Sequence, residues 1–135
     1  MIFLSLLFFV LAAACNAVMD TLQHHFCSSK IYYMLRKPTQ AYWWNPEFSW
    51  KNKYIDRDPA KPLRKILWFD FPFNDAWHTF KSLMVLCLCF SLLFAFLSER
   101  RAELWIDLLC IPVWGICWNL TFNLFYNKIL IKKWH

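Results

Sequence analysis

The sequence predicts an all-α membrane protein with three transmembrane helices and an aromatic loop that lies on the membrane surface. Hydrophobic residues make up 59% of the 135 residues, aromatic residues make up 21%, and there is a single Gly. The apolar residues gather in three long runs, and five of the six Pro lie between the first and second runs. This composition is typical of a small helical membrane protein rather than of a soluble or disordered chain, and its length fits a single domain.

The first predicted span covers residues 1 to about 20. Residues 1–19 include only Ser5 and Asn16 as clear polar interruptions. At about 1.5 Å per residue, this run nearly crosses a hydrocarbon core of roughly 30 Å. No Gly or Pro occurs before Pro38, so the helix is free to continue past the bilayer towards Arg36. A cleaved signal peptide is the alternative, but no basic residue precedes the apolar run, and we therefore expect a retained span.

A loop with many aromatic residues is predicted over residues 38–74. Its Pro residues exclude a long helix. Trp and Tyr alternate with Lys between Tyr42 and Tyr54, and such residues prefer the headgroup layer of a membrane. A second apolar and aromatic patch, residues 66–73, is typical of an interfacial or re-entrant segment. We expect the loop to lie on the membrane and to cover the ends of the spans.

The second and third spans are predicted over residues 76–97 and 104–126. Asn74 or Asp75 precedes the second span and is suited to cap its first turn. The third span contains Pro112 and Gly115, which are expected to kink it. A short polar turn, residues 98–103, joins the two spans.

Positive charges predict the orientation of the chain. The loop and the segment before it hold nine basic residues: Lys30, Arg36, Lys37, Lys51, Lys53, Arg57, Lys61, Arg64 and Lys65. Basic residues are enriched in cytoplasmic loops. We therefore expect a multi-pass protein of the cell inner membrane, with the N-terminus outside and the loop and C-terminus in the cytoplasm. The formal charge of +6 then indicates anionic headgroups as a partner, and no nucleic acid.

Each predicted span carries polar residues at its cytoplasmic end, at helical spacing. On the first span they form one stripe, whereas His25 points away from it. The stripes are Asn16, Asp20, Gln23 and His24; Asp75, His78 and Ser82; and Asn119, Asn123 and Asn127. Because the stripes lie at one depth, we expect their side chains to meet between the helices.

Two interpretations of these stripes remain open. The first is a polar cluster that fixes helix register through interhelical hydrogen bonds. The second is a divalent metal site, most simply for Zn²⁺, because carboxylates and imidazoles are suitable ligands. Its ligands would be Asp20, His24, Asp75 and His78. The side chains that would hydrogen-bond to these ligands are Asn16, Gln23, Asn119, Asn123 and Ser82.

The two interpretations lead to different functions. A metal with an open coordination position would activate water, which suggests a hydrolase acting on a lipid headgroup or another amphiphile at the inner edge of the bilayer. The alternative is a non-enzymatic interaction module that binds a larger membrane complex through its aromatic, basic loop. A membrane protein partner or a homo-oligomer is compatible with either function.

Three motifs also resemble a known group of proteins. They are Asn16-x3-Asp20, Trp44-Asn-Pro46 with the aromatic residues that follow, and Asp75-Ala-Trp-His78. As a set they resemble an uncharacterised family of small integral membrane proteins of bacteria and their phages, over about the first two-thirds of the chain. The resemblance implies a membrane location and brings no catalytic roles.

Overall fold

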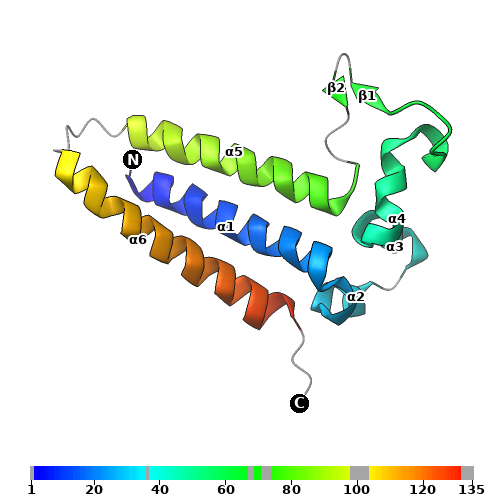
Figure 1. Ribbon diagram of the computed structural model, residues 1–135, viewed down its shortest axis with the longest axis horizontal. Coiled ribbons are helices and arrows are strands. Elements are labelled where there is room, and N and C mark those ends of the chain that lie inside the picture. The colour runs from blue at the N-terminus through cyan, green and yellow to red at the C-terminus, as the bar shows by residue number, and fades with distance from the viewer. Residues whose placement is uncertain (1, 36, 67–68, 71–73, 98–103, 132–135) are drawn as a thin grey trace.

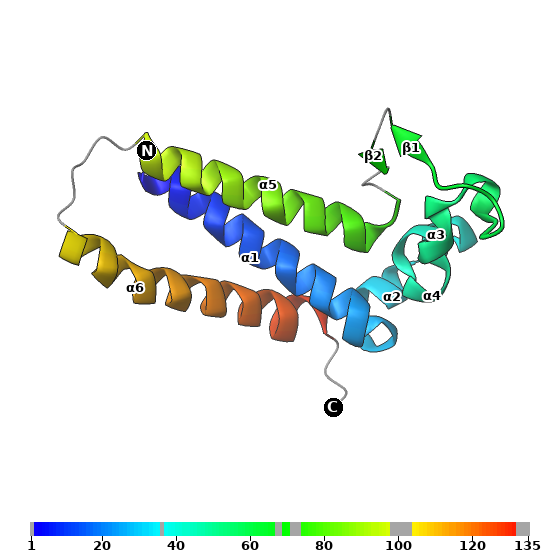
Figure 2. The ribbon, with the colours of Figure 1, turned by 45° about the horizontal axis from the view of Figure 1, so that its top comes forward.

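Three long helices lie side by side in the structure, a computed structural model that describes residues 2–35, 37–66, 69–70, 74–97 and 104–131. They are α1 (Ile2–His24), α5 (Ala76–Phe96) and α6 (Leu104–Asn123). α1 lies between the other two, and α5 runs antiparallel to both, as Figures 1 and 2 show. The prediction of a mostly helical protein is confirmed for the described residues.

Two of the helices, α1 and α5, are long and apolar enough to cross a membrane. Over 18-residue windows their mean hydropathies are 2.4 and 2.0, but only 28% and 6% of these windows are buried inside the protein. A core helix of a soluble protein would be mostly buried, so these helices present apolar side chains outward. α6 has a comparable length of 20 residues, close to 30 Å at about 1.5 Å per residue.

α1 contacts both neighbours through consecutive aromatic residues. The Phe8 ring lies 5.2 Å from Phe90 of α5, whereas the Phe9 ring lies 4.7 Å from Trp114 and 5.3 Å from Trp118 of α6. Adjacent residues of a helix point about 100° apart, which lets one helix contact two partners in this way. Fully buried small residues of α1 let its neighbours approach closely, namely Ala12, Ala13 and Ala17.

One hydrogen bond joins α1 to α5 within this apolar bundle. The Ser5 hydroxyl donates to the backbone carbonyl of Ser91 over 2.7 Å, and the two hydroxyl oxygens are 3.4 Å apart. Both residues are almost completely buried. Ser5, one of the two polar interruptions of the first predicted span, therefore contributes to helix packing.

Short elements fill the segment between α1 and α5. They are η1 (Phe26–Ser28), α2 (Lys30–Met34), α3 (Pro38–Trp44), α4 (Pro46–Ser49), η2 (Trp50–Lys53), η3 (Ile55–Arg57), β1 (Lys65–Ile66) and β2 (Phe69–Asp70). The two strands pair antiparallel, with Ile66 opposite Phe69. After α6 the chain continues as the π-helical turn η4 (Leu124–Leu130). As predicted, the Pro-rich loop contains no long helix in its described part.

Local sequence signals explain where the short helices begin. The Ser29 hydroxyl accepts a hydrogen bond from the Tyr32 amide at the start of α2. The Asn45 side chain accepts one from the Glu47 amide at the start of α4. α3 and α4 each have Pro at the first helical position. Asn45 followed by Pro46 combines a polar cap with Pro, which favours a helix start, and α3 ends at Trp44, directly before this cap.

A cluster of buried hydrophobic residues lies at the junction of the bundle and the loop. It consists of Leu22 of α1, Phe26 of η1 and Ala76 of α5. Partly buried hydrophobic residues pack around it, among them Trp43 and Trp44 of α3. This packing holds the loop against the bundle end at which α1 stops and α5 starts (Figures 1 and 2).

Several boundaries differ from those predicted. The first helix does not continue to Arg36, because it ends at His24 and the backbone of His25 has non-helical angles, φ −135° and ψ 24°. The third helix is α-helical only to Asn123, three residues short of the predicted end. Most of the predicted interfacial patch at 66–73, the turn at 98–103 and the tail after residue 131 lie outside the described residues.

Candidate functional site

The first Asp–His pair lies at the N-terminus of α5. Asp75 is the N-cap, and one carboxylate oxygen accepts a hydrogen bond of 2.8 Å from the His78 amide. The other oxygen lies 2.8 Å from His78 Nδ1. The Asp75 side chain is only 5% exposed, whereas that of His78 is half exposed. Helix capping therefore accounts for Asp75, and its carboxylate also fixes the orientation of the imidazole.

The second Asp–His pair lies at the C-terminal end of α1. Asp20 and His24 are 3.8 Å apart at their nearest polar atoms. The side chain of Tyr126, in η4, lies near the Asp20 carboxylate. This is an interhelical contact, and it joins the first and third helices at the end where polar stripes were predicted.

Tyr126 also contacts His25, which was predicted to point away from the polar stripe. The two rings meet edge to face, with centroids 5.6 Å apart. α1 ends at His24 and the backbone of His25 has non-helical angles, so the direction of His25, which was taken from an ideal helix, stays a prediction. Tyr126 was not predicted from the sequence, because only carboxylates, imidazoles and amides were considered as site residues. Its position at the end of the third apolar run was the available signal.

The metal site predicted from Asp20, His24, Asp75 and His78 stays a prediction. Among the described residues, no group of three or more His, Cys, Asp or Glu side chains is placed to hold a metal ion. Each Asp instead engages its own helix or η4. The arrangement corresponds to the polar-cluster interpretation for Asp20, and to helix capping for Asp75.

The side chains predicted to hydrogen-bond to the metal ligands differ in burial and in their partners. Asn16 and Ser82 are half-buried, whereas Gln23 is exposed. On α6, the Asn119 amide donates to the Gly115 carbonyl over 3.0 Å, and the Asn123 amide donates to the Asn119 carbonyl over 2.8 Å. The Asn127 amide continues the ladder to the Asn123 side chain. These described bonds run along the helix, because an i, i+4 spacing favours local contacts.

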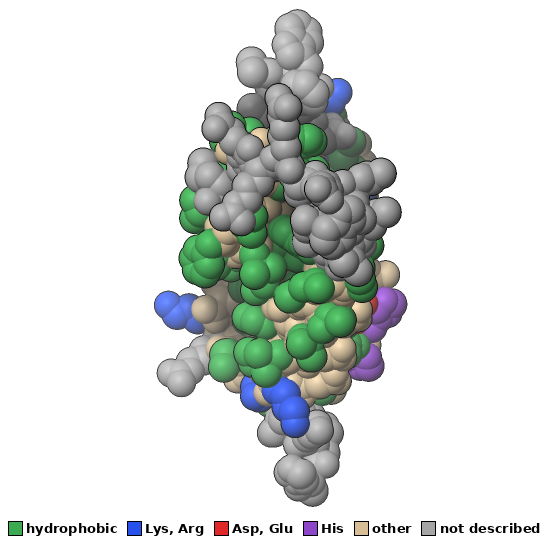
Figure 3. Space-filling view, turned by 90° about the vertical axis from the view of Figure 1, so that its left-hand side faces the viewer, with side chains coloured by type: hydrophobic (Ala, Val, Ile, Leu, Met, Phe, Trp, Pro, Cys, Tyr) green, Lys and Arg blue, Asp and Glu red, His purple; other side chains and the backbone are tan. Residues whose placement is uncertain are grey.

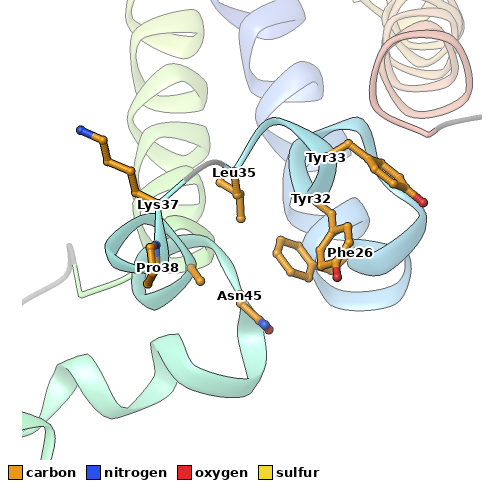
Figure 4. Close-up of a pocket in the computed structure, with 8 residues that line it drawn as sticks. Phe26, Tyr32, Tyr33, Leu35, Lys37, Pro38 and Asn45 are labelled. Carbon is orange, nitrogen blue, oxygen red and sulfur yellow. The ribbon is translucent and has the colours of Figure 1, made fainter.

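A crevice of about 400 Å³ opens between α2 and α3, next to the packed junction. Its lining is mainly aromatic and apolar, as Figure 4 shows: Phe26, Tyr32, Tyr33, Leu35, Lys37, Pro38, Ala41 and Asn45. These lining residues include no His, Asp, Glu or Cys. The crevice therefore suits an apolar or aromatic group.

The part of the loop that follows carries basic groups above aromatic rings. We name residues 38–66 the aromatic–basic segment. In it, Lys51 lies over Trp50, Lys53 over Tyr54, and the guanidinium of Arg57 only 4.1 Å from the centroid of the Tyr42 ring. Such cation–π contacts hold the aromatic ring and the positive charge on the same patch of surface.

Comparison of the chain with protein-family models, with curated proteins and with solved structures gave no match.

Proposed function

We propose that the protein is a three-span inner-membrane protein that acts as a non-enzymatic interaction module. In this proposal the helical bundle is embedded in the bilayer. The aromatic–basic segment rests on the anionic cytoplasmic surface, and the crevice between α2 and α3 receives an apolar group of a partner membrane protein. The observation that carries the proposal is the set of cations stacked on aromatic rings, on a segment held at one end of an outwardly apolar bundle.

The outward faces of the helices support embedding in lipid. Phe3 of α1 is 75% exposed, and Phe96 of α5 is 83% exposed. On α6, Leu120 is 67% exposed. Hydrophobic side chains also make up most of the coloured surface at the end of the bundle shown in Figure 3, with charged groups only at its margins. Such continuous apolar surface is unfavourable in water and favourable in a bilayer.

The arrangement of the helices supports the predicted orientation. The loop after α1 and the chain after α6 lie at the same end of the bundle (Figures 1 and 2). Basic residues concentrate at this end, and the positive-inside rule assigns it to the cytoplasm. α6 is the third span in this proposal, with the N-terminus outside and the C-terminus inside.

The aromatic–basic segment is suited to the headgroup layer of that surface. A Trp or Tyr ring there interacts with the boundary of the acyl chains, while the cation above it contacts lipid phosphates. Each basic side chain near an anionic surface contributes about 1 kcal/mol. The crevice lies next to this segment, so headgroup binding would keep it at the membrane surface, where a partner's juxtamembrane apolar group can enter it.

We prefer this function to the metal-dependent hydrolase that the sequence also suggested. That hydrolase required four side chains around one ion, whereas Asp20 and Asp75 belong to two separate local arrangements. The resemblance to the family of small membrane proteins of bacteria and phages remains part of the proposal. The motifs quoted for it support this membership.

Lipid binding can be tested by hydrogen–deuterium exchange on the full chain in nanodiscs. We expect amides of the aromatic–basic segment to exchange more slowly with phosphatidylglycerol than with phosphatidylcholine alone, and high salt to reverse the effect. The triple variant Lys51→Gln, Lys53→Gln, Arg57→Gln should lose this difference. A matched variant that removes three charges elsewhere, Lys30→Gln, Lys81→Gln, Lys128→Gln, should keep it. Equal exchange of the wild-type segment in both lipids would overturn the proposal.

Orientation can be tested independently with C-terminal fusions. A fluorescent protein fused after the last residue should fluoresce in the cytoplasm, whereas alkaline phosphatase at the same position should be inactive. The reverse pattern would place the aromatic–basic segment outside the cell and refute the proposed function.

A further inference from the structure

The chain's single glycine lies on an exposed face of α6, and no contact among the described residues requires it there. A Cβ built on Gly115 would meet no atom within 4 Å. Its backbone does not have the positive φ that only glycine readily adopts. Gly is nevertheless unfavourable in a helix interior by about 1 kcal/mol relative to Ala. Neither packing nor backbone geometry inside one chain therefore explains this residue.

The same face carries the asparagine ladder. Asn119 and Asn123 follow Gly115 at successive four-residue steps, and all three residues are exposed. The contacts between α6 and α1 use other residues, Trp114 and Trp118. An amide side chain has two donor hydrogens and a carbonyl oxygen with two lone pairs. The bonds within α6 therefore use only part of the hydrogen-bonding capacity of each side chain.

The depth of this face in the proposed membrane makes the unused hydrogen-bonding capacity of its asparagine side chains significant. In a membrane-spanning α6, Asn119 lies four residues before the cytoplasmic end, about 6 Å inside the hydrocarbon at roughly 1.5 Å per residue. Polar groups at such a depth are unfavourable against lipid and normally face another helix. Exposed apolar residues flank the stripe on α6, including Ile116 at 59% and Leu120 at 67%. They would supply the packing surface around it.

We propose that a second copy of this chain packs on the Gly115–Asn119–Asn123 face of α6, forming a parallel dimer. Two copies in one membrane have the same orientation, so the symmetry axis between them places each asparagine at the depth of its counterpart. The amide is self-complementary, because each can donate to the carbonyl of the other. Gly115 allows the two backbones to approach closely at this crossing, as small residues commonly do between membrane helices.

Energy transfer between two differently labelled full-length copies in liposomes tests the dimer. We expect transfer for the wild type and its loss in Gly115→Leu, because the added side chain blocks the crossing, while its Cβ meets no described atom of its own chain within 4 Å. Asn119→Leu should raise the dimer dissociation constant roughly 10- to 1,000-fold, the equivalent of the two interhelical hydrogen bonds of the reciprocal amide pair. Val85→Leu, at an exposed position of α5, is the control and should leave the transfer unchanged.

The inference rests on the proposed membrane embedding, and the two can fail separately. Alkaline carbonate extraction of membranes reports whether the protein is embedded. An embedded wild-type protein that shows no transfer, or whose transfer survives both α6 substitutions, overturns the dimer and leaves the proposed function intact. Loss of transfer in the α6 variants with unchanged helical circular dichroism supports the dimer, because misfolding is then not the cause.

Discussion

Replacing Ser5 with Ala should destabilise the bundle more than replacing its partner Ser91. The reason is the geometry of the hydrogen bond, in which the Ser5 hydroxyl donates to the Ser91 backbone carbonyl over 2.7 Å. Ser5→Ala removes this donor. Ser91→Ala keeps the carbonyl and loses only the weaker 3.4 Å contact between hydroxyl oxygens. Two similar substitutions at one contact thus test which atom is the acceptor.

The magnitude follows from the surroundings of the bond. Interhelical hydrogen bonds in membranes contribute about 0.6 kcal/mol on average and up to about 2 kcal/mol. In an α-helix the Ser91 carbonyl also accepts from the amide four residues on, so losing Ser5 does not leave it without a partner. We therefore expect Ser5→Ala to lower the free energy of unfolding by roughly 0.6–1 kcal/mol, and Ser91→Ala by less than about 0.5 kcal/mol.

The free energy of unfolding can be measured by steric trapping or by titration with a denaturing detergent in bicelles. The double variant should match Ser5→Ala, because the second substitution removes nothing further of consequence. Leu92→Ala, 60% exposed beside Ser91, is the control and should have no effect on the packing of α1 against α5. A larger loss in Ser91→Ala than in Ser5→Ala would refute the assigned donor and acceptor.

Three further outcomes can be checked on the same purified protein. Asp75→Ala should lower the stability by about 0.5–2 kcal/mol through loss of the N-cap. Asp75→Asn should retain most of the stability, because its side-chain oxygen still accepts from the helix amide. Equal losses of the two variants in a melting experiment would contradict capping. Tyr126→Phe should destabilise the protein only when Asp20 is present, and a double-mutant cycle with Asp20→Ala measures this coupling, which should be absent if the two side chains form no hydrogen bond. Elemental analysis should give the same zinc content for the wild type and for the double variant Asp20→Ala, His78→Ala; a loss in this variant that His25→Ala does not share would restore the four-ligand site.

The sequence predicted the long helices well because their signal is redundant. Each apolar run contains many residues that agree, so the type of element does not depend on any one of them. Asp75 was predictable as a cap for a different reason, since a short polar residue directly before an apolar run has few other structural uses. The length of α1 was not predictable, because no Gly or Pro marks its end at His24.

The candidate site was harder to predict because the directions of its histidines depend on the exact residue at which α1 ends. His24 and His25 have the same chemistry, and their directions were assigned by continuing an ideal helix past the point where the real one ends. Convergence between helices also cannot be read from the spacing within each helix. The α6 amides are at the expected helical positions, yet their bonds run to Gly115 and to one another along the same helix.

The central position of α1 has a consequence for how the protein is made. About 51 residues separate His24 from Ala76, so at roughly 5–20 residues per second the ribosome takes about 3–10 s to begin α5 after completing α1. During that interval α1 has neither of its neighbours, and its Ser5 hydroxyl lacks its acceptor on α5. In the proposed membrane-embedded arrangement, the helix made first must therefore be stable in the bilayer by itself. Its mean hydropathy of 2.4, above the 2.0 of α5, agrees with this requirement of biosynthetic order.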